Sequence, residues 1–88
     1  MSKKRKLLAR VSNNQKNVDF DDMVTLIEAF GFRRVRISGS HHIFERSNLS
    51  EIVNLQNQKG QAKPYQVRQF LTLVEQYNLS LEDAEEEE

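Results

Sequence analysis

The chain has 88 residues, no cysteine, and 13 basic side chains balanced by 13 acidic ones, which gives a formal net charge of zero. This length provides for one small domain with a modest core, and the lack of cysteine excludes disulfides and thiolate-bound zinc. No apolar run approaches the roughly 20 residues that span a bilayer, and none follows the basic N-terminus as in a secretory signal. We therefore expect a cytoplasmic protein without a membrane partner.

The charges are distributed unevenly along the chain. Residues 1–17 contain six basic side chains and no acid, whereas residues 81–88 contain six acids and no base. We expect residues 1–17 to be disordered or weakly helical, residues 81–88 to be disordered, and a single domain to cover residues 18–80. A basic arm can bind nucleic acid, and an acidic tail can fold back on it or shield it. Alternatively, both ends are solvated tails that only aid solubility.

The first predicted element of the domain is a helix that begins after Asp19. The Asp19 carboxylate can accept hydrogen bonds from the free amides of the first turn, and Asp21 and Asp22 favour the positive end of the helix dipole. Gly31 ends the helix, because glycine adopts the left-handed conformation without a steric penalty. Apolar residues recur at helical spacing and form one face: Phe20, Met23, Val24, Ile27 and Phe30.

A first strand is predicted over residues 32–38. Alternation places Val35 and Ile37 on one face and Arg34 and Arg36 on the other. Arg33 adds a third basic side chain to this strand. Arg34 and Arg36, together with His41 of the next strand, are thus predicted to face solvent on the side of the sheet away from the helices.

The turn Gly39-Ser40 leads into a second strand over residues 41–46, and a third strand follows over residues 51–55. In the second strand, His42 and Phe44 share one face, and His41 and Ile43 share the opposite one. The segment over residues 57–63 is rich in polar side chains and is predicted to be a loop.

Pro64 opens the last predicted helix, because its missing amide costs no hydrogen bond there, and Asn78 is a plausible stop. The order helix, three strands, helix predicts an α+β domain: a three-stranded antiparallel sheet with two helices on one face. This is the architecture of double-stranded-RNA-binding-like folds, which read RNA by shape, phosphates and 2′-hydroxyls. The predicted core consists of Phe20, Met23, Val24, Ile27, Val35, Phe44, Val53, Val67, Phe70, Leu71 and Val74.

The two adjacent histidines beside the arginines indicate chemistry on a phosphodiester. Imidazole can take and give a proton near neutral pH, and guanidinium groups bind phosphate. We expect His41 to be the catalytic acid or base, because His42 shares its face with Phe44, which should be buried; a shift of one residue in register would exchange the two. The expected RNA-binding residues are Arg34, Arg36, Gly39, Ser40 and His42.

Other interpretations of these residues stay open. One alternative is an RNA-binding module without catalysis, and another is a protein-interaction domain whose histidine-bearing face is occupied by a partner. A further alternative for the arginines is that they are edge charges that deter aggregation. No metal or cofactor is expected, because the only two histidines, His41 and His42, are adjacent and point to opposite faces of a strand.

The segment from Gly31 to Phe44, with its Gly-Ser-His-His turn, followed by Lys63-Pro64 and a final apolar helix, resembles the HicA family of toxin–antitoxin systems over about residues 18–80. The resemblance implies a small ribonuclease that cuts mRNA or other single-stranded RNA and is neutralised by a HicB-type antitoxin. The family's glycine and catalytic histidine fall on Gly39 and His41. Residues 54–63 depart from the family pattern, because they lack the Pro-His-Pro segment that many relatives carry.

Overall fold

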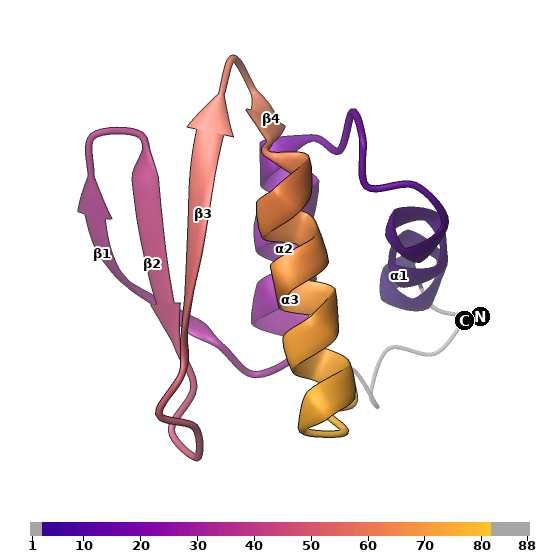
Figure 1. Cartoon of the computed structure of the whole chain (residues 1–88), viewed down its shortest axis with the longest axis vertical. Coiled ribbons are helices and arrows are strands. Elements are labelled where there is room, and N and C mark those ends of the chain that lie inside the picture. Colours follow the sequence, from indigo (N-terminus) through magenta and orange to yellow (C-terminus); the bar gives the residue numbers. More distant parts are fainter. Residues whose placement is uncertain (1–2, 82–88) are drawn as a thin grey trace.

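The computed structural model describes residues 3–81. The described residues form three helices and four strands, in the order α1 (Lys3–Asn13), α2 (Phe20–Ala29), β1 (Arg33–Ser38), β2 (His41–Glu45), β3 (Ile52–Gln58), β4 (Gln61–Ala62) and α3 (Pro64–Gln76). The strands form one antiparallel sheet in the order β1-β2-β3-β4 (Figure 1). The α+β class is confirmed, whereas α1 and β4 are additions to the predicted helix, three strands and helix.

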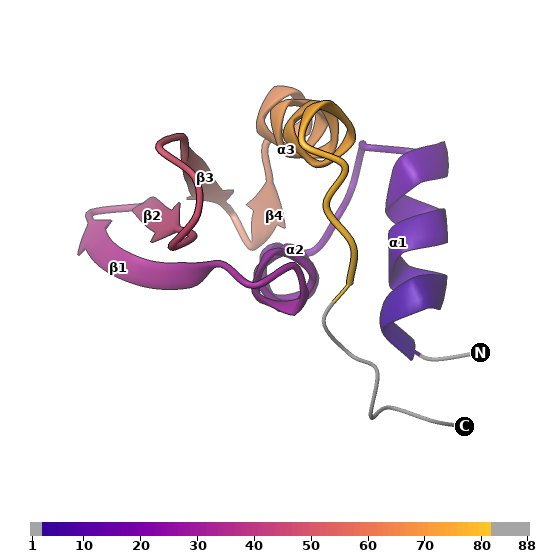
Figure 2. The same cartoon turned by 90° about the horizontal axis from the view of Figure 1, so that it is seen from below.

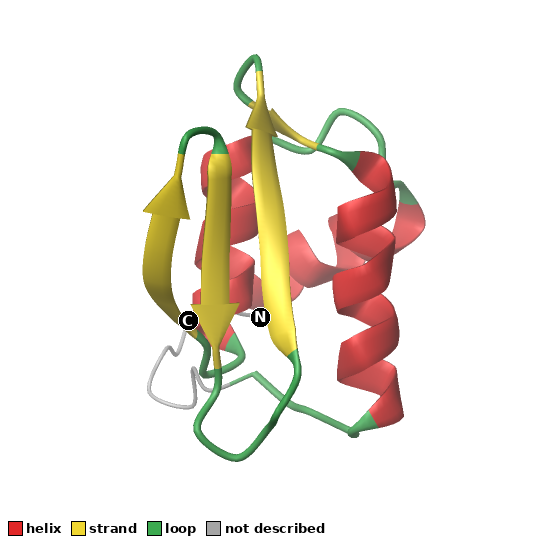
Figure 3. Cartoon of the chain, turned by 60° about the vertical axis from the view of Figure 1, so that its left-hand side comes forward, coloured by secondary structure: helices red, strands yellow, loops and turns green. Residues whose placement is uncertain are grey.

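The elements lie in three layers. Helices α2 and α3 lie on one face of the sheet, as predicted, and α1 lies on their far side (Figures 1 and 2). Figure 3 shows the sheet in front of the helices, and within residues 3–81 no element covers its other face. We call this surface the open face. A side chain on β1, β2 or β3 therefore points either toward the helices or to the open face.

The pairing of β2 and β3 confirms the predicted faces of β2. Phe44 pairs with Val53 and His42 pairs with Leu55, and Phe44, Val53 and Leu55 are all buried beneath the helices. Directly opposed residues share a face of a sheet. His42 and Phe44 therefore lie on the helix side of β2, and His41 lies on the open face.

A bulge in β1 changes which arginines share a face. Arg34 pairs with Phe44 and Arg36 pairs with Ile43, so Val35 is an extra residue between two consecutive pairs. Arg34 therefore lies on the helix side and Arg36 on the open face. The prediction that both arginines lie on one face is wrong, because strict alternation fails at a bulge.

Helix α1 replaces the arm that we expected to be disordered or weakly helical. Val11 is only 1% exposed, and Leu7 and Leu8 pack against the same core. Burial of these side chains stabilises a helix that would be marginal alone at this length. The predicted acidic tail beyond Leu81 lies outside the described residues, and Leu81 itself packs against the core.

The core differs from the predicted one at Val35, which is 46% exposed because it occupies the bulge. Val24, Leu71 and Val74 are only partly buried and pack against the core. The other predicted core residues are buried. The structure adds Val11, Val18, Leu26, Ala29, Phe30, Phe32, Leu55 and Ala62 to the buried set.

The polar segment predicted as a loop over residues 57–63 contains the end of β3 and all of β4. The Ala62 amide donates to the Val18 carbonyl at 2.9 Å, and the Phe20 amide donates to the Gly60 carbonyl at 2.9 Å. These bonds hold the start of α2 against β4. Asp19 occupies the N-cap position of α2, but its side chain makes no capping hydrogen bond.

The three other predicted boundary residues are confirmed, and Asn78 follows the end of α3 with a φ of 52°. Gly31 follows α2 with a φ of 94°, which is the left-handed conformation that favours glycine. Pro64 is the first residue of α3. Within α3 the buried Gln66 accepts a hydrogen bond from the Gln56 amide at 2.7 Å, which fixes α3 beside β3.

Candidate functional site

The β1–β2 hairpin presents both histidines directly after its turn. Gly39 has a φ of 61°, so the turn requires a residue that tolerates the left-handed conformation. A Cβ atom at Gly39 would meet no atom within 4 Å, so backbone conformation rather than lack of space favours glycine. Gly39 and Ser40 are exposed, and His41 begins β2 immediately after them.

His41 lies on the open face, where a residue of the neighbouring strand β3 holds its side chain in place. Its Nδ1 atom is 3.3 Å from Oδ1 of Asn54 on β3. A carbonyl oxygen can only accept, so Nδ1 carries the proton in this contact and Nε2 of the neutral ring has a lone pair. His41 is exposed. The structure thus gives an oriented imidazole whose second nitrogen is available to a ligand.

Arg36 lies on the same open face as His41. It pairs with Ile43, two residues along β2 from His41, and its side chain is exposed. Arg33, which pairs with Glu45, lies further along the same face. The open face of the hairpin therefore combines an imidazole with two guanidinium groups, a set that suits a phosphodiester.

His42 and Arg34 form a second arrangement on the helix side of the hairpin. Nη1 of Arg34 is 3.3 Å from Nδ1 of His42, and the Phe20 ring contacts the imidazole edge-on at a centroid distance of 4.7 Å. Partial burial and then the nearby Arg34 charge lower the pKa of His42 below its ordinary value. Both effects disfavour the protonated form of the His42 imidazole.

The structure divides the predicted site residues into two groups. His41 and Arg36 lie together on the open face, whereas His42 and Arg34 lie together on the helix side. Gly39 and Ser40 lie in the turn between the two groups. No single ligand-binding surface includes all the predicted residues, because the bulge at Val35 turns Arg34 away from Arg36.

Asn54 is the residue of this site that sequence reasoning missed. It lies in β3, where exposed Ile52 and Asn54 alternate with buried Val53 and Leu55. This alternation was available from the sequence and predicts that Asn54 points away from the core. Placing it beside His41 also needed the register of β2 against β3, which residue types alone do not fix.

Residues 3–81 contain no group of three or more His, Asp or Glu side chains placed to hold a metal ion. None of the described helices has the length and apolar character needed to cross a membrane.

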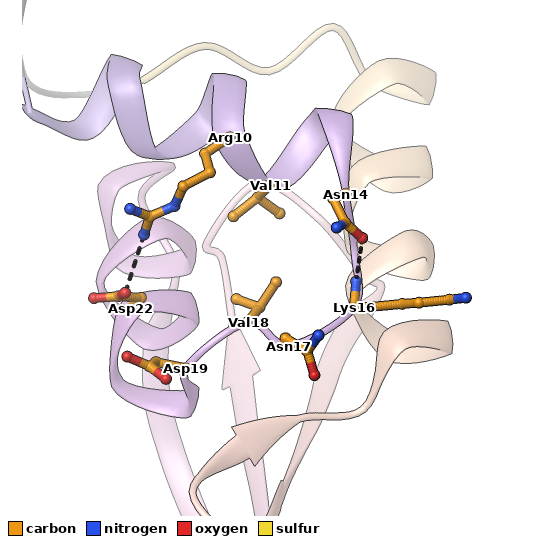
Figure 4. A pocket seen from close by; sticks show the side chains of 8 residues that line it. All are labelled: Arg10, Val11, Asn14, Lys16, Asn17, Val18, Asp19 and Asp22. Atoms are coloured by element: carbon orange, nitrogen blue, oxygen red, sulfur yellow. Dashed lines mark hydrogen bonds and ion pairs between the residues drawn. The ribbon is translucent and has the colours of Figure 1, made fainter.

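A separate hollow of about 380 Å³ lies between α1 and α2, away from the histidines (Figure 4). Arg10 and Asp22 form an ion pair across it, with Nη2 and Oδ2 3.2 Å apart. On its other side the Lys16 amide donates to Oδ1 of Asn14 at 3.0 Å. None of the predicted site residues lines this hollow, so it is not part of the hairpin site.

Comparison with protein families matches residues 20–76 to the HicA toxin of bacterial toxin–antitoxin systems. The matched segment runs from the start of α2 to the end of α3 and includes the whole hairpin. Helix α1 lies before it. Comparisons with curated proteins and with solved structures gave no significant match.

Proposed function

Because the chain belongs to the HicA toxin family, we propose that it is an endoribonuclease that cuts mRNA in the cytoplasm and is neutralised by a HicB-type antitoxin. The open face of the β1–β2 hairpin is the proposed cleavage site. His41 is the proposed catalytic residue, and Arg36 and the turn Gly39-Ser40 are proposed to bind the RNA backbone.

The contact between His41 and Asn54 carries this proposal. It leaves a lone pair on Nε2 of an exposed, oriented imidazole, which is what a general base requires. Nε2 takes the proton of an RNA 2′-hydroxyl, and the 2′-oxygen bonds to the adjacent phosphorus. The bond from phosphorus to the 5′-oxygen breaks, and the leaving oxygen takes a proton from water. The resulting hydroxide takes the proton from Nε2, which restores the neutral imidazole. The products carry a 2′,3′-cyclic phosphate and a 5′-hydroxyl.

The guanidinium of Arg36 would stabilise the negative charge that grows on the phosphoryl oxygens. No metal has a role in these steps. An antitoxin that covers the open face would block both groups at once. That face also carries Ile52, which is 54% exposed and could add apolar contact to such a complex.

The pair of His42 and Arg34 supports a second assignment within the same function. Arg34 can only donate, so Nδ1 of His42 accepts in their contact and is not available as a base while the contact persists. A phosphate that draws Arg34 away would free that nitrogen. His42 would then act as the base on the helix side of the hairpin.

Purified protein that is free of antitoxin provides the test of the function. Incubation with single-stranded RNA should give fragments that end in 2′,3′-cyclic phosphate, whereas DNA of the same sequence should remain intact. RNA that stays intact while binding tightly would favour an RNA-binding module of the same fold. RNA that neither binds nor is cut would favour a protein-interaction domain.

A further inference from the structure

Strand β3 has a neighbouring strand along the whole of one edge but along only part of the other. On one side β2 pairs with residues 52–56 of β3. On the other side β4 pairs only with Asn57 and Gln58. Figure 3 shows that α3 runs beside the rest of this second edge. Within residues 3–81, no strand therefore continues the sheet beside residues 52–55, and we call this stretch the free edge of β3.

Hydrogen bonds at the end of β3 show which backbone groups point to the free edge. The Asn57 amide donates to the carbonyl of Ser40, just before β2, at 2.9 Å. The Gln56 amide points the other way and donates to a side chain of α3. Backbone groups alternate in direction along an antiparallel strand. The N–H and C=O groups of Ile52 and Asn54 therefore point to the free edge as well.

A groove of about 220 Å³ lies between the free edge and α3, and the buried Phe70 ring forms part of its wall. Side-chain contacts tie α3 to the β3 side at both ends of this groove. At one end the buried Gln66 accepts from the Gln56 amide at 2.7 Å. At the other end the Tyr77 hydroxyl donates to Glu51 at 2.5 Å. About 16 Å of extended chain separates the two ties.

We propose that this groove binds an extended segment of a partner protein, which adds to the free edge of β3 as a strand and places a basic side chain near Glu51. An added strand would pair with the N–H and C=O groups of Ile52 and Asn54. The buried Gln66 already pairs with the adjacent amide in place of a strand. Among the described residues that line the groove, Glu51 alone is charged, so the complementary charge is positive.

Two other occupants fit the groove less well. A nucleic acid would bring its phosphates to the Glu51 carboxylate, whose pKa is lowered by the Tyr77 hydrogen bond and which therefore keeps its charge. A second copy of this chain would carry its own α3 along the edge that had to pair. The inference does not rest on the proposed ribonuclease activity, because it depends only on backbone groups and on the wall that α3 provides.

Amide hydrogen exchange in the natural protein tests the free edge. The Asn54 amide should exchange about tenfold faster or more than the amides of Val53 and Leu55, which point to β2. The Gln56 amide should be protected, because Gln66 accepts its hydrogen bond. An Asn54 amide as protected as its two neighbours would overturn the proposal. Protection that appears only as the protein dimerises would assign the edge to a second copy and would also overturn it.

Synthetic peptides test the occupant. The probes are end-blocked hexapeptides of alternating valine and threonine, with one lysine at either the first or the last position. At about 1 mM, one of the two should shift and protect the amides of Ile52 and Asn54 in NMR spectra, and its identity gives the direction of the added strand. The same peptide with N-methylated amides cannot donate and should not bind. Binding by neither lysine peptide, or equal binding after N-methylation, would overturn the proposal.

Variants at Ile52 separate backbone pairing from side-chain contact. Ile52→Pro removes an N–H group that points to the groove, at the first residue of β3, where proline is tolerated. Ile52→Ala removes the exposed side chain and keeps the amide. Peptide affinity should fall about tenfold or more in Ile52→Pro and less than about twofold in Ile52→Ala. Equal losses in the two variants would contradict strand addition, and the N-methylated peptide makes the same comparison without changing the protein.

The expected basic side chain is tested at Glu51. Glu51→Gln should weaken the lysine peptide about threefold or more at low salt and leave a lysine-free peptide unaffected. Tyr77→Phe is the matched control, because it breaks the same hydrogen bond but keeps the carboxylate. It should not weaken the peptide. Equal weakening in the two variants, or none in Glu51→Gln, would exclude the charge contact that the proposal includes.

Discussion

Oδ1 of Asn54 lies 3.3 Å from Nδ1 of His41, so β3 orients the histidine that β2 presents on the open face. The two residues are diagonal neighbours, because Asn54 pairs with Ile43 and His41 pairs with Gln56. A side chain held in this way loses less freedom when RNA binds. Asn54 is thus a positioning residue for the proposed base.

Asn54→Ala should therefore reduce RNA cleavage about tenfold or more, because an imidazole that is free to rotate spends less time in the productive orientation. RNA affinity should change little, since Asn54 acts through His41. Asn48→Ala is the control, because Asn48 is an exposed asparagine in the loop between β2 and β3. Gel assays of initial cleavage rate and of binding measure both effects. A cleavage rate in Asn54→Ala as high as that of the natural protein would exclude the positioning role of Asn54.

The second histidine gives a prediction about pH. Burial and the Arg34 charge both oppose protonation, so the pKa of His42 lies below 6.5. In Arg34→Gln the charge is removed, and the pKa of His42 should move back toward 6.5. NMR titration of the imidazole protons measures it. The Arg36→Gln variant, which removes a charge from the opposite face, should leave this pKa unchanged.

The direction of the His42 pKa shift also determines how the stability of the folded state changes at acidic pH. The folded chain binds a proton at His42 less tightly than the unfolded chain does, so protonation favours unfolding. Stability should fall as the pH drops from about 6.5 through the lower pKa of the folded state. A His42→Gln variant should lose less stability over that window. Urea denaturation at a series of pH values gives the free energy of unfolding. If this free energy depended on pH identically in the natural protein and in His42→Gln, the lowered pKa of His42 would be contradicted.

Phe70 anchors α3 in the core, where it contacts Phe30 and Phe32 edge-on at centroid distances of 5.6 and 5.7 Å. Phe70→Ala should lower the free energy of unfolding by about 3–5 kcal/mol, which can abolish folding in a domain of this size. Val35→Ala is the control and should change stability by about 0.5 kcal/mol or less, because Val35 is 46% exposed in the bulge. Thermal unfolding of both variants tests the burial of these positions.

Helix α1 should behave as part of the domain. Val11 is 1% exposed and packs against the core. Val11→Ala should therefore lower the free energy of unfolding by about 1–3 kcal/mol, whereas Ser12→Ala on the exposed side should have little effect. Circular dichroism during thermal unfolding provides the comparison. Equal stability of the two variants would mean that α1 does not depend on its core contact.

The sequence alone was enough to predict the elements that depend on patterns of neighbouring residues. The apolar spacing of Phe20, Met23 and Ile27, the stop at Gly31 and the start at Pro64 depend only on neighbouring residues, and each was predicted correctly. The faces of β2 were also correct, because that strand pairs with β3 without interruption.

The features that depend on distant partners were missed. Helix α1 is stabilised by apolar contacts with residues far along the chain, and its basic composition masks the short stripe that makes them. Strand β4 consists of only two residues and is defined by its pairing with β3. The bulge at Val35 follows from the register of β1 against β2, so residue types alone could not separate Arg34 from Arg36.

The proposed catalytic role of His41 is tested by cleavage of single-stranded RNA by the natural protein, His41→Ala and His42→Ala, all in EDTA. We expect full activity without divalent metal for the natural protein. In His41→Ala we expect a loss of about 10²–10⁴-fold with the fold and RNA affinity retained, and in His42→Ala a much smaller loss. A substrate with a 2′-deoxynucleotide before the cut should resist all three. Full activity in His41→Ala would exclude His41 as the catalytic base, and activity of the natural protein that disappears only on chelation would exclude the metal-independent mechanism.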